Sequence, residues 1–191
     1  EEPIFSDHKN IKLLINNLKD NKVAVVAAAG NDFYRHSSKQ GMASPAIIHE
    51  TISVGAVYDA EVGERTYASG ARTFVSAPDR ITSFSQRLHQ SINPRKSTDV
   101  FAPGAPIISS GISHDNHSSE DSGTSQATPV VTGVILLLQE YHLKRTGYLP
   151  SVDDLKRYLR DGGVVINDGD DEDDNVTNTG LDFIRLIYVK I

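Results

Sequence analysis

The chain has 191 residues, a length that suits one domain with a substantial core. Its formal net charge of −6, with no long run of Lys and Arg, argues against a nucleic-acid partner. It has no cysteine, which excludes disulfides and thiolate metal sites, and no apolar run reaches the roughly 20 residues that span a membrane. We therefore expect one soluble domain, residues 1–191, that binds neither nucleic acid nor membrane.

The first third of the chain predicts a helix followed by two strands of an α/β fold. Residues 10–20 carry apolar side chains at helical spacing, which predicts an amphipathic surface helix: Ile11, Leu14, Ile15 and Leu18. Residues 23–29 and 51–57 are short, β-branched apolar runs, typical of parallel strands covered on both faces. Ligand chemistry gathers at the carboxyl ends of such strands, where Asn31 stands.

The middle of the chain is less regular. Residues 58–83 are polar and predict surface loops, with a short strand at 73–75 as an alternative. Residues 99–104 predict a short strand closed by a turn. Residues 106–112 and 118–123 predict a hairpin that delivers the chain to the next helix.

A small polar turn, residues 123–129, leads into the apolar run 130–138, which predicts a buried helix. With Thr124 as the N-cap, Ser125 takes the first helical position, where backbone N–H groups are unpaired and negative charge is favoured. This turn is consistent with an ordinary capped helix or with a seat for a nucleophile.

The last third predicts one further helix, capped by Ser151 with Asp154 at the third position and ended by Gly162 and Gly163. Its inward residues are Leu155 and Leu159. Residues 181–191 fit either a helix or a strand.

An acidic segment precedes this tail, with six carboxylates in the seven positions from Asp168 to Asp174. Calcium prefers such oxygen ligands, so a structural calcium ion is one interpretation. The segment lacks the glycine and terminal glutamate of an EF-hand, and a solvated charge run is the other interpretation.

Five segments, in order along the chain, resemble the C-terminal part of the catalytic domain of the subtilisin-like serine peptidases, the subtilases (peptidase S8): Val25–Asn31, Thr51–Val57, Ser83–Ser85, Asp99–Gly104 and Gly123–Pro129. The last of these is similar to the family's serine signature. The resemblance implies a three-layer α/β fold with a mostly parallel sheet flanked by helices, present here as an incomplete C-terminal part.

The resemblance also implies roles for individual residues. Ser125 would be the nucleophile of acyl-enzyme peptide hydrolysis, and Asn31 with the Ser125 backbone N–H would bind the oxyanion. Ala28, Ala29 and Gly30 would form one wall of the substrate pocket. Judged from the residues alone, Asn31 is a turn residue and the three small residues serve close sheet packing.

The family's aspartate and histidine motifs lie upstream of the matched segments, and none of the seven histidines here is followed by Gly-Thr. His114 and His117 lie near Ser125 in sequence, but loop histidines are more often solvated. The first residue, Glu1, is not an initiator Met. We therefore expect a fragment that is inactive alone and that needs an upstream part of the same protein carrying the Asp and the His.

As partners, we expect a polypeptide substrate and self-association through an open sheet edge. The chemistry requires no cofactor, and the family favours a secreted or extracytoplasmic location. The alternative is a non-catalytic interaction or structural module with a subtilase-like fold.

Overall fold

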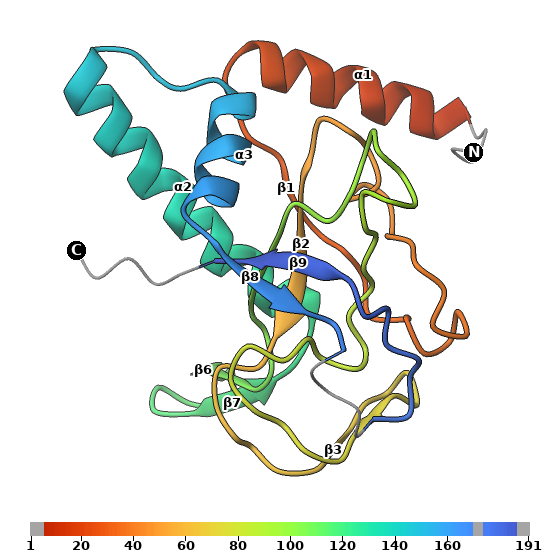
Figure 1. The fold of residues 1–191 in the computed structure, drawn as a ribbon. Helices are drawn as coiled ribbons and strands as arrows, with labels where there is room; N and C mark the ends of the chain where they lie inside the picture. The colour runs from red at the N-terminus through yellow and green to blue at the C-terminus, as the bar shows by residue number, and fades with distance from the viewer. Residues whose placement is uncertain (1–5, 170–173, 187–191) are drawn as a thin grey trace.

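Five strands form one mostly parallel sheet in the order β1-β2-β5-β9-β8 (Figure 1). The computed structural model describes residues 6–169 and 174–186. The first four strands of this order run parallel to their neighbours, and β8 is antiparallel to β9. Their bounds are β1 Val26–Ala28, β2 Ile52–Val57, β5 Val100–Pro103, β8 Val164–Asn167 and β9 Asp182–Arg185.

The strands predicted at 51–57 and 99–104 are confirmed as β2 and β5, and both are buried along their whole length. The strand predicted at 23–29 is shorter than expected, since β1 keeps only Val26–Ala28. Among the described residues β1 has one partner, β2, so its other edge is open. Pairing ends after Ala29, because the next residue, Gly30, turns the chain away with a φ of 112°.

Two helices, α2 (Thr124–Thr146) and α3 (Val152–Asp161), share one hydrophobic core with the sheet. Leu155 and Leu159 of α3 are buried in this core, as predicted, and Ser151 forms the predicted capping box with Asp154. A mostly parallel sheet flanked by helices is therefore confirmed. A smaller apolar cluster contains Phe101 of β5 and Phe183 of β9.

The helix α1 (Ser6–Asp20) confirms the first predicted helix and lies at the end of the molecule where β1 and β2 begin (Figure 1). Of its four predicted inward residues only Ile15 is buried, and Leu14 is 61% exposed. The expectation of a buried α2 is also wrong in part, because Leu136 and Leu137 are 61% and 51% exposed. The helix packs against the sheet along one side only, and no described residue covers its other apolar side.

Two small hairpins complete the fold. The strands β6 (Ile107–Ser110) and β7 (Ser118–Asp121) pair antiparallel and confirm the hairpin predicted before Ser125. The strands β3 (Arg65–Thr66) and β4 (Arg72–Thr73) form a two-residue ladder, so the strand considered at 73–75 lies earlier than expected.

The prediction of surface loops for residues 58–83 is wrong in part. Tyr58, Thr73 and Ser83 are fully buried, although two of them are polar. The Tyr58 hydroxyl donates to Thr73 Oγ1 at 2.9 Å, and Thr73 Oγ1 donates to Ser83 Oγ at the same distance. These hydrogen bonds satisfy the hydroxyls, which makes their burial tolerable.

The tail forms the strand β9 over Asp182–Arg185, and residues 187–191 lie outside the described residues. In the part of the chain that is described, no helix has the length and apolar character needed to cross a membrane.

Candidate active site

The chain leaves β1 through a turn that only glycine fits. Gly30 has a φ of 112°, and a β-carbon there would collide with the end of the Gln86 side chain. The Gly30 carbonyl accepts the Gln86 N–H at 2.8 Å, which fixes the turn. Asn31 therefore leaves the carboxyl end of the sheet in a defined direction.

A second glycine begins α2 at the same end of the sheet. The Gly123 N–H donates to the carbonyl of Gly104, the residue after β5, at 2.8 Å. Gly123 is the N-cap of α2, so the prediction that Thr124 caps the helix is wrong. Thr124 already lies in the helix, fully buried, and its hydroxyl bonds to the residues after β1 in place of its own first turn. Ser125 is therefore the second helical residue and not the first.

Asn31 and Thr124 join these two segments, although they lie 93 positions apart in sequence. The side-chain oxygen of Asn31 accepts both the backbone N–H and the hydroxyl of Thr124, each at 2.9 Å. The Thr124 hydroxyl in turn accepts the Gly30 N–H at 3.1 Å. Because a backbone N–H can only donate, the Asn31 atom facing it is the carbonyl oxygen, and the amide nitrogen points elsewhere.

The amide nitrogen of Asn31 points to a small space above Gly123. A β-carbon built on Gly123 would lie 2.7 Å from Gln126 Oε1, 3.0 Å from Asn31 Nδ2 and 3.6 Å from the Ser125 backbone nitrogen. Neither of these N–H groups has an acceptor among the hydrogen bonds of the described residues. Two free donors and the side-chain oxygen of Gln126 therefore border one space at the start of a helix. The two donors suit negative charge once the flexible end of Gln126 turns away.

The side chain of Ser125 is exposed beside this space and makes no hydrogen bond within the described part of the chain. His114 and His117 lie in the turn between β6 and β7, where their rings pack edge to face with centroids 5.4 Å apart. The hydrogen bonds that His117 makes with described residues stay within residues 111–117. No described histidine is hydrogen-bonded to Ser125.

The three small residues before Asn31 do not share one environment. Ala29 is fully buried, while Ala28 and Gly30 are half-buried. Ala29 is also held on both sides by backbone hydrogen bonds, from its N–H to Val54 and from Ala43 N–H to its carbonyl. Sheet packing accounts for Ala29, and Ala28 and Gly30 keep some exposed surface.

A cleft of about 530 Å³ begins at Asn31 and Ser122 and extends to the β3 and β7 strands. Two ion pairs line it, each at 3.1 Å: Arg65 of β3 pairs with Glu120 of β7, and Arg35 pairs locally with Asp32. Tyr67 packs edge to face on Phe84 in its wall, and burial, with the neighbouring phenol of Tyr58, raises the pKa of Tyr67. The cleft gives an extended ligand room beside Ser125.

Comparison with known proteins assigns the chain to a family. A family model described as "Subtilase family" matches residues 4–169, which is most of the chain. The chain belongs to the subtilase family.

Similar subtilases include serine protease AprX of Bacillus subtilis, 30% identical over 170 residues, which are 83% of this chain and 33% of AprX. The alkaline proteinase of Hapsidospora chrysogena is 31% identical over 126 residues, 66% of this chain and 31% of the relative. Among solved structures, the prenylagaramide maturation protease PagA has a TM-score of 0.60 at 26% identity, covering 85% of this chain and 48% of PagA. The subtilase chain thus spans about a third of these two curated relatives.

The sequence did not predict that Thr124 orients Asn31, nor did it predict the residues that line the cleft. The signal for Thr124 was present, since it precedes Ser125 in the serine signature, but its partner lies 93 positions away. The cleft brings together β3, β7 and the turn after β1, which are distant in sequence.

The acidic segment can be judged only at its ends, because residues 170–173 lie outside the described residues. The carboxylate of Asp168 is buried, pairs with Arg87 at 3.0 Å and accepts the Thr179 N–H at 2.7 Å. In the described ranges, no group of three or more His, Asp or Glu side chains is arranged to hold a metal ion.

Proposed function

We propose that the chain supplies the nucleophile and the oxyanion-binding groups of a subtilisin-like serine endopeptidase. Ser125 attacks the peptide carbonyl and forms an acyl-enzyme, which water then hydrolyses. The Asn31 amide and the Ser125 backbone N–H stabilise the negative oxygen of the tetrahedral intermediate. The substrate is a polypeptide.

The observation that carries this proposal is the pair of free donors above Gly123. Asn31 Nδ2 and the Ser125 nitrogen lie 3.0 and 3.6 Å from the position that a β-carbon on Gly123 would take, beside an exposed serine hydroxyl. The side-chain oxygen of Gln126 lies 2.7 Å from the same position. The start of an ordinary capped helix does not require an asparagine whose side-chain oxygen accepts two hydrogen bonds from Thr124 while its NH₂ group has no acceptor among the described residues. Binding of a developing oxyanion gives both donors a partner.

The general base and its carboxylate come, in our proposal, from an upstream part of the same protein. No described histidine is bonded to Ser125, and the chain covers only a third of AprX. The open edge of β1 and the exposed apolar side chains of α1 and α2 give such a part a surface to cover. Without it, the residues 1–191 are inactive.

The substrate chain would pass Ala28 and Gly30 on one side of the oxyanion space and enter the cleft on the other. Asp121 lies at this entrance, where its carboxylate accepts the Ser122 N–H at 2.8 Å and the Gln126 side chain at 3.0 Å. The two arginines of the cleft are already paired with Asp32 and Glu120. The remaining charge of the cleft is therefore negative, which favours a basic substrate residue beyond the cleaved bond.

A second candidate function is a non-catalytic module that associates through the open edge of β1. The uncovered apolar residues of α2 favour association of some kind, and a second copy of the chain is the other occupant of this surface. Aspartate and His-Gly-Thr motifs upstream of residue 1 separate the candidates, because only the peptidase needs them. A location outside the cytoplasm and a structural calcium ion are further expectations, which rest on the family resemblance and on the acidic segment.

A fluorophosphonate probe tests the proposal directly, since it modifies only an activated serine. We expect labelling of the intact protein at Ser125, loss of labelling in Ser125→Ala, and normal labelling in Ser119→Ala, a control on the exposed strand β7. The isolated residues 1–191 should show negligible labelling. If the intact protein resists the probe and Ser125→Ala leaves peptide hydrolysis unchanged, the peptidase proposal is wrong.

A further inference from the structure

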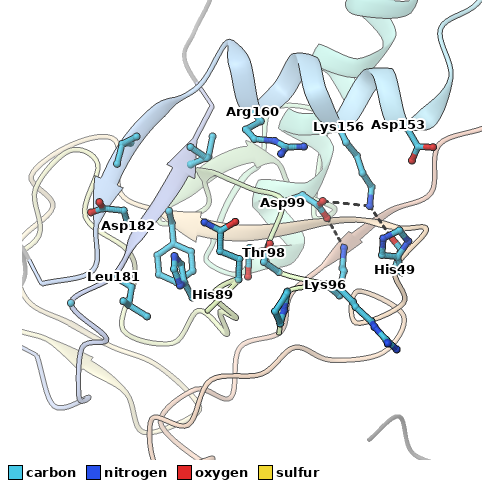
Figure 2. Close-up of a pocket in the computed structure, with 18 residues that line it drawn as sticks. His49, His89, Lys96, Thr98, Asp99, Asp153, Lys156, Arg160, Leu181 and Asp182 are labelled. Atoms are coloured by element: carbon cyan, nitrogen blue, oxygen red, sulfur yellow. Dashed lines mark hydrogen bonds and ion pairs between the residues drawn. The ribbon is translucent and has the colours of Figure 1, made fainter. Parts of the chain in front are cut away.

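A cavity of about 750 Å³ lies at the amino ends of the parallel strands β5 and β9 (Figure 2). Asn31, in contrast, follows the carboxyl end of β1. Asp99 directly precedes β5 and Asp182 begins β9, and both line the cavity. One face of α3 forms another wall, with Asp153, Lys156 and Arg160 at helical spacing. The volume suits a small molecule.

Two lysines reach the same carboxylate in this cavity. Figure 2 shows Lys156 extending from α3 and Lys96 from the opposite wall toward Asp99. Lys96 Nζ lies 2.5 Å from Asp99 Oδ2, and Lys156 Nζ lies 3.4 Å from Asp99 Oδ1. Two ammonium groups thus share one counter-charge.

The carboxylate of Asp99 has little capacity left for either lysine. Its Oδ2 also accepts the backbone N–H and the hydroxyl of Ser53, at 2.8 and 2.7 Å. Lys96 donates once more, to the Thr51 carbonyl at 3.0 Å, and Lys156 donates to the His49 carbonyl at 2.7 Å. Because each ammonium has three N–H groups, both lysines keep donor capacity that no described residue uses.

The guanidinium groups add to this excess. Arg160 of α3 and Arg95 line the cavity, and neither side chain has a hydrogen bond or an ion pair in the described part of the chain. The two remaining carboxylates of the cavity are engaged by other groups. Asp153 pairs with Lys19 at 2.8 Å, and Asp182 accepts the Asn167 amide at 2.8 Å.

The cavity therefore holds four cations, three carboxylates that are all engaged, and several N–H donors that lack an acceptor. The lining thus has one more cationic side chain than it has carboxylates, in a chain whose net charge is −6. From this arrangement we propose that the cavity binds a small molecule with multiple anionic oxygens. Arg160 and Arg95 hold it by their planar N–H groups, and Lys96 and Lys156 bind it at the base of the cavity.

Phosphate-bearing molecules and small polycarboxylates share this chemistry. The two sources are separated by titrating the intact protein with pyrophosphate and, separately, with citrate, at constant ionic strength set by sodium chloride. We expect a saturable rise in the melting temperature with at least one of them, since a ligand that binds only the folded state stabilises it by mass action. A response to one anion alone identifies its oxyanion class.

Arg160→Gln should weaken this binding about tenfold or more, the loss of roughly one charge-assisted contact. Arg160 is exposed and unpaired, so the variant should fold normally. Arg157→Gln is the matched control, because Arg157 lies on the same helix but pairs with Asp154 away from the cavity. Arg95→Gln tests the opposite wall.

The proposal is overturned if neither anion gives a saturable shift, or if Arg160→Gln binds as well as the unmodified protein. An equal loss in Arg157→Gln and Arg160→Gln would also overturn it, since that result indicates general charge screening and not a site. Peptidase activity is not part of these measurements, so their outcome is independent of the role of Ser125.

Discussion

The oxygen of the Asn31 side chain is tied twice to Thr124, by the backbone N–H and by the hydroxyl, each at 2.9 Å. Thr124 thereby decides which way the Asn31 amide nitrogen points. In the intact protein, Asn31→Ala should lower kcat by about 10²- to 10³-fold, the range known for the corresponding donor in a subtilisin. Thr124→Val should lower it by about tenfold, because it removes one of the two bonds that hold the amide.

The two substitutions act on the same donor, so their effects should not add. The double variant should therefore be no slower than Asn31→Ala, measured as kcat on a peptide substrate. A double variant that is slower by the product of the two factors would contradict a positioning role for Thr124.

Gly123 leaves the space that both donors border, and its φ of 169° is open to any residue. Gly123→Ala should therefore act by filling the space and displacing the end of the Gln126 side chain, whose oxygen the new β-carbon would approach to 2.7 Å, and not by straining the backbone. We expect a large loss of kcat with little change in substrate binding, because the oxyanion forms only in the transition state. In the isolated chain, where Gly133 is exposed and a β-carbon there meets no atom, Gly133→Ala should leave stability unchanged or raise it slightly.

Much of the fold could be predicted, because the relevant signals are local. The apolar run 51–57 became β2, and the Ser151 capping box became the start of α3. The burial of Tyr58 and Thr73 could not be predicted, since the hydrogen bonds that permit it join residues distant in sequence. The polar composition of residues 58–83 therefore predicted a surface position for these two residues, which the structure shows to be buried.

The candidate site was predicted by residue but not by mechanism of positioning. Ser125 and Asn31 were identified from the motifs, yet Thr124 was expected to cap its own helix. Instead, the Thr124 hydroxyl donates to the side-chain oxygen of Asn31, which follows β1, so this hydroxyl does not cap the helix. The cavity at Asp99 gave no sequence signal, because its charges come from three separate segments, residues 95–99, residues 153–160 and Asp182.

A buried ion pair anchors the start of the acidic segment. Arg87 is fully buried, and its guanidinium carbon lies 3.7 Å from the centre of the Phe33 ring. Its Nε lies 3.0 Å from Asp168 Oδ2. Asp168→Asn keeps an acceptor for the Thr179 N–H but removes the negative charge of this buried ion pair, so it should destabilise the protein by up to about 3–5 kcal/mol. Urea unfolding of the intact protein measures this. Asp153→Asn, whose carboxylate is 65% exposed, should cost less than about 1 kcal/mol.

The uncovered side of α2 gives a test of what lies against it. In the isolated chain, Leu137→Asp should leave stability unchanged within about 0.5 kcal/mol, since Leu137 is half exposed there. In the intact protein, the same substitution should destabilise by several kcal/mol, because an upstream part that packs on α2 would bury the new charge. Thermal unfolding of both forms checks this, with Ile112→Asp, at a fully exposed position, as the control. Equal effects in both forms would show that nothing upstream covers this side.

The stability of the protein should rise with pH between 8 and 10.5 because of Lys96. Burial, which Asp99 opposes and Lys156 reinforces, lowers the pKa of Lys96 from 10.5 to about 8. Below pH 8 the amine is charged in both states, and the cost of burying it is fully present. Between pH 8 and 10.5 only the unfolded chain keeps the proton, so the free energy of unfolding increases with pH, by on the order of 3 kcal/mol in total.

Lys96→Met removes the amine but keeps most of its buried stem, and should lack this increase in urea unfolding measured across the same range. Lys144→Met, at an exposed position on α2, should retain it, and a falling or flat profile in the unmodified protein relative to Lys96→Met would rule the assignment out.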